Sequence, residues 1–266
     1  MPLRAVEAMD PGRFSHRDAI DGFLVAAGFF TRLPFPYPSQ APRLAEAIWA
    51  APLAGVVVGL ACGVAGGLAT ALGLPPHLAA VVALAAGMLV TGALHEDGAA
   101  DLADGFGGGR TREAKLEIMR DSRIGSYGAL ALIVSTLARW AAYAAILGAA
   151  SGIVALWIAV AVHAGSRAVI PAFMARVPSA RSDGLSAGAG AVADRTAFVA
   201  LAIGAIVALP LGFGFLAAAV LVVAVVTSGV AVLCRRQIGG QTGDVLGALQ
   251  QLCETGLLFV AAAILI

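Results

Sequence analysis

The chain of 266 residues has little charge, few aromatic residues and little cysteine. Charged residues make up 12% of the chain and aromatic residues 6%, whereas 60% are hydrophobic. The mean hydropathy is +0.91, and a soluble domain of this length would need more polar surface, so a soluble globular protein is excluded. The three cysteines, Cys62, Cys234 and Cys253, lie far apart in or beside apolar runs. Inert buried thiols are therefore favoured over a disulfide framework or a zinc site.

Long apolar runs predict an all-α, polytopic integral membrane helical bundle with about seven spans, because each run approaches the roughly 20 residues that cross a bilayer. We expect residues 1–266 to form a single membrane domain, and the first residues lack the apolar core of a cleavable signal peptide. The fifth span is the weakest, because it is short and Pro210 lies near its end, so 197–233 could instead be a tight hairpin or one bent element. The predicted spans are 48–72, 78–94, 127–148, 153–174, 197–212, 215–233 and 245–266.

The basic residues outside these spans follow an alternating pattern. The segments before the first span and after the second, fourth and sixth spans all carry arginine, whereas 73–77, 149–152 and 210–214 carry no Lys or Arg. Because Lys and Arg accumulate in cytoplasmic loops, the pattern predicts a cytoplasmic amino terminus, a carboxyl terminus outside, and insertion in the inner membrane. Residues 1–47 would then be a cytoplasmic or interfacial segment. Its apolar part, 21–36, ends at prolines and predicts an interfacial helix, or alternatively a lid or docking surface for an amphipathic substrate.

Residues 95–127 carry most of the chemistry, and we interpret them as a cytoplasmic catalytic loop between the second and third spans. Asp97, Asp101 and Asp104 follow i, i+4, i+7 spacing and would share one face of a helix. Three like charges on one stripe repel each other unless a cation lies among them, and oxygen ligands favour Mg²⁺ or Mn²⁺. The simpler alternative is a solvated acidic helix end at the membrane surface.

Glycines accompany these carboxylates. Gly98 and Gly105 would leave room for a bulky ligand to approach the backbone. The turn 107–109, which is followed by Arg110, has exposed amides suited to a phosphate, although glycine triplets are more often simple connectors. A second helical pattern begins at Thr111.

Beyond this helix, Asp121 is bracketed by Arg120 and Arg123, with Ser122 between them. The group is either a salt-bridged helix end or a further metal ligand whose neighbouring arginines hold phosphate oxygens. Phosphoryl transfer needs both metal ligands and cations. The predicted catalytic and metal-binding residues are Asp97, Asp101, Asp104 and Asp121, and the predicted phosphate-binding residues are Arg110, Arg120, Ser122 and Arg123.

Other polar residues are secondary candidates, namely His95, Glu96, Arg167, Arg181 and Asp244. Asp244 begins the last span and is either a further ligand or a carboxylate favoured by the helix dipole. Arg139 and Arg167 lie within spans and need partners, for which Glu254 is a candidate. His163 is expected to be a hydrogen-bonded buried histidine.

Four ordered blocks resemble cobalamin synthase, the membrane adenosylcobinamide-GDP ribazoletransferase family. The blocks are Phe29-Phe30-Thr31-Arg32-Leu33-Pro34, the acidic segment from His95 to Gly105 with Lys115 to Gly128, Ala180-Arg181-x-Asp183-Gly184-Leu185, and Gly239-Gly240-Gln241-Thr242-Gly243-Asp244-Val245-Leu246-Gly247-Ala248. One departure is Glu96, where the family often has an apolar residue.

The resemblance implies Mg²⁺-dependent transfer of the cobinamide phosphate moiety from adenosylcobinamide-GDP to α-ribazole or its 5′-phosphate, with release of GMP. It implies a lipid bilayer and these substrates as partners and no nucleic acid, and it leaves room for a homo-oligomer or association with other cobalamin-pathway enzymes. The runner-up is a CDP-alcohol phosphotransferase, although this chain has Asp101 where that pattern has Ala-Arg. A cation transporter or a purely structural subunit are the remaining alternatives.

Overall fold

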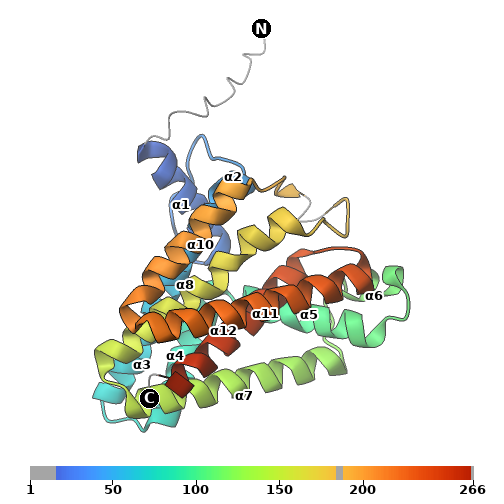
Figure 1. The fold of residues 1–266 in the computed structure, drawn as a ribbon. Coiled ribbons are helices and arrows are strands. Elements are labelled where there is room, and N and C mark those ends of the chain that lie inside the picture. The colour runs from blue at the N-terminus through green and yellow to red at the C-terminus, as the bar shows by residue number, and fades with distance from the viewer. Residues whose placement is uncertain (1–15, 184–187, 265–266) are drawn as a thin grey trace.

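The computed structural model describes residues 16–183 and 188–264, which form a helical bundle (Figure 1). Some residues used in the sequence predictions lie outside the described residues. They are Arg4 and Arg13 before the first predicted span, Gly184 and Leu185 of the third resemblance block, and the last two residues of the seventh predicted span. The helices are α1 (His16–Phe30), α2 (Leu44–Ala47), η1 (Ile48–Ala50), α3 (Ala51–Ala71), α4 (Pro76–Thr91), α5 (Leu94–Gly108), α6 (Arg112–Ile118), α7 (Ser126–Ala149), α8 (Gly152–Arg176), α10 (Asp194–Ala208), η2 (Leu209–Leu211), α11 (Phe213–Ile238) and α12 (Gly243–Ile264).

Six helical segments within the described residues are long and apolar enough to cross a membrane. They are the continuous segment α2–η1–α3, then α7, α8, α10 with η2, α11 and α12. The shorter α4 is the seventh apolar segment, with 16 residues. The prediction of an all-α multi-pass bundle with about seven spans is therefore confirmed in its helical content and in the number of apolar segments.

The second predicted span ends earlier than expected, and the segment after it is not a loop. Helix α4 ends at Thr91, and Gly92 and Ala93 both adopt left-handed backbone angles, with φ of 64° and 55°. Because both residues leave the helical region, the chain turns by 88° into α5. The predicted catalytic loop is thus two helices, α5 and α6, and α5 with its four acidic residues leaves the direction of α4 and packs against α12 and α7.

The fifth and sixth predicted spans are separate helices rather than one bent element. The break falls at Gly212, whose φ is 94°. Helix α10 packs on α8, where a methyl group added at Gly204 would lie 2.6 Å from Ala168 Cβ, whereas α11 packs on α12, where one added at Gly256 would lie 2.7 Å from Val222 Cγ1. The two helices diverge because each has a different neighbour (Figure 1).

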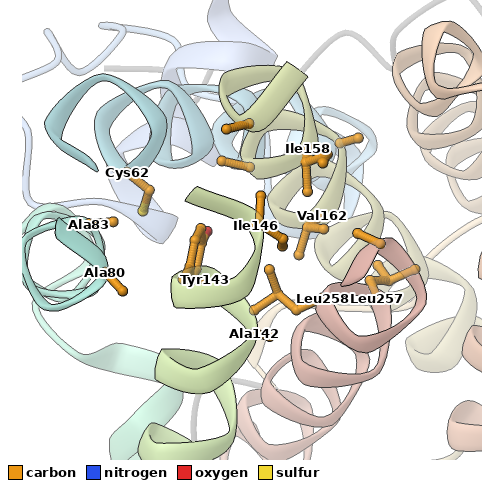
Figure 2. Packing of buried hydrophobic residues seen from close by; sticks show 14 of the residues in the cluster. Cys62, Ala80, Ala83, Ala142, Tyr143, Ile146, Ile158, Val162, Leu257 and Leu258 are labelled. Carbon is orange, nitrogen blue, oxygen red and sulfur yellow. The ribbon is translucent and has the colours of Figure 1, made fainter. Parts of the chain in front are cut away.

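The bundle core is built from α3, α4, α7, α8 and α12 (Figure 2). Gly59 and Gly63 bring α3 against α8, because a methyl group at these positions would lie 2.5 Å from Val160 Cα and 3.0 Å from Leu156 Cα. Small residues at helix contacts are typical of membrane bundles, where close backbone packing replaces the hydrophobic effect. Cys62, Cys234 and Cys253 are buried free thiols, as predicted.

A helix, α1, is present where the sequence predicted an interfacial helix, and its apolar face is buried against the bundle. It begins earlier than predicted, at His16, and ends at Phe30, before Pro34. Gly22 faces the indole of Trp49, and Phe30 is buried.

The charged connections gather at one end of the bundle. The Arg112 side chain donates to the carbonyls of Ile238 and Ala180 at 2.8 and 2.7 Å, and Arg235 donates to the carbonyl of Arg176 at 2.6 Å. At the opposite end two of the uncharged connections lie close together, where Pro76 lies beside Gly148. The segregation of arginines that the sequence predicted is therefore present in the fold.

Candidate active site between helices α5 and α12

Two glycines let helices α5 and α12 touch through their backbones. A methyl group added at Gly98 would lie 3.1 Å from Asp244 Cα, and one added at Gly247 would lie 3.2 Å from Gly98 Cα. The Cβ position of Gly98 therefore faces α12 rather than a ligand, although Gly98 also lines a cavity beside Asp97. Gly105 is likewise covered by α6, with Lys115 O 3.0 Å from the added methyl. Both glycines therefore serve helix packing.

The contact places Asp244 beside Asp97 and Asp101, and we call these three carboxylates the acidic site. Asp97 is exposed, whereas Asp101 and Asp244 are half-buried. Burial raises the pKa of Asp101 to about 6, helped by the negative charges of Asp97, Asp244 and Asp104. Thr242 Oγ1 donates a hydrogen bond of 3.1 Å to Asp244 Oδ2. The predicted helical spacing is confirmed, and these carboxylates act on one another as neighbouring like charges.

The acidic site has the donor chemistry of a Mg²⁺ site without a preformed cage. Within residues 16–183 and 188–264, no three His, Cys, Asp or Glu side chains are grouped closely enough to hold a metal ion alone. Mg²⁺ keeps several waters and is usually bound by one or two carboxylates together with substrate phosphates, so a preformed cage is not required. The mutual repulsion that raises the pKa of Asp101 is what a bound cation would relieve.

The structure gives Asp104 a different position from its helix neighbours. Its carboxylate is buried and accepts hydrogen bonds from the backbone N–H groups of Gly125, at 2.7 Å, and Gly128, at 2.8 Å. These groups belong to the start of α7, where backbone N–H groups lack partners within the helix and favour a negative charge. Asp104 thus fixes the start of α7 to α5.

Asp121 lies at the surface and contacts only one of its two neighbouring arginines. Arg123 binds its carboxylate at 2.6 Å and holds the pKa of Asp121 below its usual range. Arg120 instead pairs with Asp183 at 2.7 Å. Both pairs are exposed, and exposed ion pairs are weak enough to exchange partners. Ser122 and Arg110 are also exposed. The predicted phosphate-binding residues are accessible, but Asp121 is not brought into the acidic site.

Arg181, a secondary candidate, is the arginine most closely linked to the acidic site. Its positive charge lowers the pKa of Asp101, opposing the upward shift from burial. The guanidinium donates to the carbonyl of Leu116 at 2.8 Å, and its buried Nε has no hydrogen-bond partner among the described residues. A half-buried cation with a free donor beside carboxylates is suited to holding a phosphate oxygen.

A second group of charges lies inside the bundle, and we call Glu96, Arg139, His163, Arg167 and Glu254 the buried ion cluster. Arg139 pairs with Glu96 at 2.9 Å and with Glu254 at 3.1 Å. His163 Nδ1 lies 3.2 Å from Glu254 and also 3.2 Å from Arg167 Nη1. The predicted pairing of Arg139 with Glu254 and the hydrogen-bonded state of His163 are confirmed. Glu96 and Arg167, which were candidates for the site, point into this cluster.

Sequence reasoning did not single out Thr242, Gly247 or the Gly125–Gly128 turn as parts of the site. Thr242 and Gly247 lie in the fourth resemblance block, so the block itself was the available signal. The two amides at 125 and 128 carry no side-chain signal, because only their backbone N–H groups contact Asp104.

The fold and the site define a multi-pass helical membrane protein with a carboxylate-rich site and exposed arginines at one end of its bundle. The family model described as cobalamin-5-phosphate synthase matches residues 22–262. A protein of Mesorhizobium japonicum named adenosylcobinamide-GDP ribazoletransferase is 49% identical over 252 residues, covering 94% of this chain and 96% of the relative. One of Bradyrhizobium diazoefficiens with the same name is 50% identical over 258 residues, covering 96% and 98%.

The chain therefore belongs to the cobalamin-5-phosphate synthase family and is an enzyme of cobalamin synthesis. No solved structure gives a significant match.

Proposed function

We propose that this enzyme transfers the cobinamide phosphate moiety of adenosylcobinamide-GDP to α-ribazole or α-ribazole 5′-phosphate, giving adenosylcobalamin or its 5′-phosphate and GMP. The names of the relatives support this reaction over a CDP-alcohol phosphotransferase or a cation transporter. The observation that carries it is the acidic site, where three carboxylates from α5 and α12 meet beside Arg181.

In this proposal Mg²⁺ is held by Asp97, Asp101 and Asp244. Their oxygen-only donor set suits a hard cation. When bound, the ion would offset negative charge on the diphosphate of the donor substrate. Asp104 and Asp121 are left out of the proposed ligand set, because Asp104 is held by two backbone N–H groups and Asp121 by Arg123.

The protein groups then have defined tasks. One carboxylate of the acidic site accepts the proton of the ribose hydroxyl, whose oxygen forms a bond to the cobinamide-linked phosphorus. The bond from this phosphorus to the bridging oxygen breaks, and GMP leaves with the electron pair. Arg181 and Arg120 hold the non-bridging oxygens of the cobinamide-linked phosphate. Arg110, Ser122 and Arg123 contact the guanosine-linked phosphate.

We further propose that the acidic site faces the cytoplasm from the inner membrane, with the amino terminus inside and the carboxyl terminus outside. The arginine-bearing connections at this end of the bundle support this orientation. A homo-oligomer, or association with other enzymes of the pathway, is compatible with the exposed apolar surfaces of α7 and α11.

The test is reconstitution of the purified protein in lipid with adenosylcobinamide-GDP, α-ribazole and Mg²⁺. GMP and the corrinoid product should form together in equal amounts, and removal of Mg²⁺ with EDTA should stop both. GMP release without a coupled corrinoid product would indicate hydrolysis and contradict the proposal. Turnover that persists in EDTA would contradict the metal requirement.

A further inference from the structure

A cavity of about 160 Å³ opens beside the acidic site, between α1, α2, η1, α8 and the first turns of α5 and α12. Asp97 and Asp244 line one end of it. The rest of the wall is mainly carbon, contributed by Phe29, Phe30, Leu44, Ile48, Ile170 and Met174. The cavity thus joins an apolar recess to the carboxylates proposed to act on the substrate.

We propose that this cavity binds the base of the acceptor, a flat and largely apolar bicyclic heteroaromatic such as the dimethylbenzimidazole of α-ribazole. The inference rests on the proposed function and adds a subsite to it. An apolar cavity of about 150 Å³ binds benzene, so this cavity of about 160 Å³, which opens beside the acidic site, holds a flat aromatic ring system of that order of size. A bicyclic base is close to this size, whereas a corrin ring is far larger.

The residues that line the cavity favour this base over guanine, which is of similar size. Guanine carries hydrogen-bonding groups along most of its edge, and each group left unpaired in an apolar recess weakens binding. A dimethylbenzimidazole attached to ribose has only one free ring nitrogen, and its methyl-bearing edge is apolar. The aromatic and aliphatic wall made by Phe29, Phe30 and Ile170 therefore matches the acceptor base rather than the nucleotide of the donor.

One polar group in the wall matches the single free nitrogen of this base. His95 lines the cavity, is buried, and stacks on Phe30 with ring centroids 5.9 Å apart and an angle of 6° between the planes. Its Nε2 is buried and has no hydrogen-bond partner among the described residues, and the ring lies between this cavity and the buried ion cluster. An imidazole can donate to, or accept from, a ligand according to its tautomer. His95 would therefore orient the base, and the ribose would extend toward Asp97 and Asp244.

The first test narrows the cavity from two different elements with Leu44→Trp and Met174→Trp. Both side chains are half-buried, so a larger side chain is tolerated better than at the buried Ile48. Each variant should raise the KM for α-ribazole at least tenfold and leave the KM for adenosylcobinamide-GDP unchanged. The matched control is Leu221→Trp on the exposed face of α11, which should change neither KM.

The second test varies the ligand. Wild-type protein should bind the riboside of dimethylbenzimidazole about a hundredfold more tightly than that of unsubstituted benzimidazole, because each of the two buried methyl groups is worth about a factor of ten. Leu44→Trp should abolish the preference, whereas Leu221→Trp should keep it. Equilibrium dialysis with the two ribosides, without donor or Mg²⁺, measures this independently of turnover. A general loss of folding would lower both affinities and would not selectively remove the preference.

The outcomes separate the subsite from the reaction. A raised KM for adenosylcobinamide-GDP with an unchanged KM for α-ribazole would place guanine or the corrin in the cavity and overturn the proposal. Unchanged values for both substrates in Leu44→Trp and Met174→Trp would also overturn it. If wild-type protein lacks transferase activity, the proposed function fails, and dialysis of the ribosides still decides whether the cavity binds this base.

Discussion

Glu96 and Asp97 are adjacent carboxylates on the same helix, yet they belong to opposite kinds of site. Glu96 is buried and paired with Arg139 at 2.9 Å, whereas Asp97 is exposed at the edge of the acidic site. The difference follows from a rotation of about 100° per residue around a helix, which turns one side chain into the bundle and the next toward the open end. Charges in the buried ion cluster are matched with opposite charges. Those of the acidic site are neighbouring like charges, and this is the feature on which the proposed cation site rests.

The largest expected effect is on stability, from Arg139→Met in the buried ion cluster. The substitution leaves Glu96 without its cation and Glu254 with only His163, among the described residues, as its ion-pair partner, and breaking a buried ion pair destabilises by about 3–5 kcal/mol. Thermal unfolding in lipid measures the change, with the exposed Arg236→Met on α11 as control. Equal unfolding temperatures for the two variants would show that the cluster does not hold the bundle together.

The next largest effect is on turnover, from Asp101→Asn in the acidic site. We expect a fall of about 10²–10³-fold, the usual loss when one group acting on transition-state charge is removed. Stability should stay equal or rise, because the variant removes repulsion among like charges. Initial rates of GMP release measure the turnover, and thermal unfolding measures the stability. The control is Glu117→Gln on α6, which removes one negative charge at an exposed position. If the Asp101→Asn variant kept full turnover with Mg²⁺, Asp101 would not be a functional residue of the acidic site.

A smaller effect is expected from Asp104→Asn. Asp104 is buried like the members of the buried ion cluster, but it lies on α5 with two carboxylates of the acidic site. Asn has one acceptor oxygen, so one of the N–H groups of Gly125 and Gly128 loses its partner, at a cost of about 1–2 kcal/mol. The concentration of Mg²⁺ for half-maximal turnover should stay within about twofold of wild type. A Mg²⁺ requirement raised as much as in Asp101→Asn would instead make Asp104 a ligand, as the sequence predicted.

The smallest effect is expected from Arg123→Gln at the exposed pair with Asp121. Exposed ion pairs contribute little, so the unfolding temperature should not change measurably. If Arg123 contacts a substrate phosphate, the KM for adenosylcobinamide-GDP should rise by up to about tenfold, as expected for one charged hydrogen bond. A lowered unfolding temperature with an unchanged KM would assign Arg123 to structure alone.

Local features of the chain could be predicted from the sequence because they depend on near neighbours. The i, i+4 spacing of Asp97 and Asp101 predicted their common helix face, and Thr111 caps α6 through a 3.2 Å hydrogen bond from Ala114 N. The apolar runs predicted the spans by length alone. The turn at Gly92 and Ala93 was missed, because a left-handed alanine has no signal in sequence and is held there by the packing around it.

Partners across the bundle could be predicted only where few candidates existed. Glu254 was the one acid expected in the final span, and so its pairing with Arg139 could be anticipated. The roles of Gly98 and Asp104 could not, because they depend on how α5 lies against α12 and α7. The same glycine is compatible with an open approach for a ligand or with a touching helix, and only the tertiary arrangement decides.

The contact between Gly98 and Gly247 also has a consequence for biogenesis. The acidic site joins α5 to α12, so just over half of the chain is synthesised between Asp101 and Asp244. A nascent chain that has already inserted α3 to α11 lacks Asp244 and the backbone surface that covers Gly98. The site is therefore assembled only when the final helix enters the membrane.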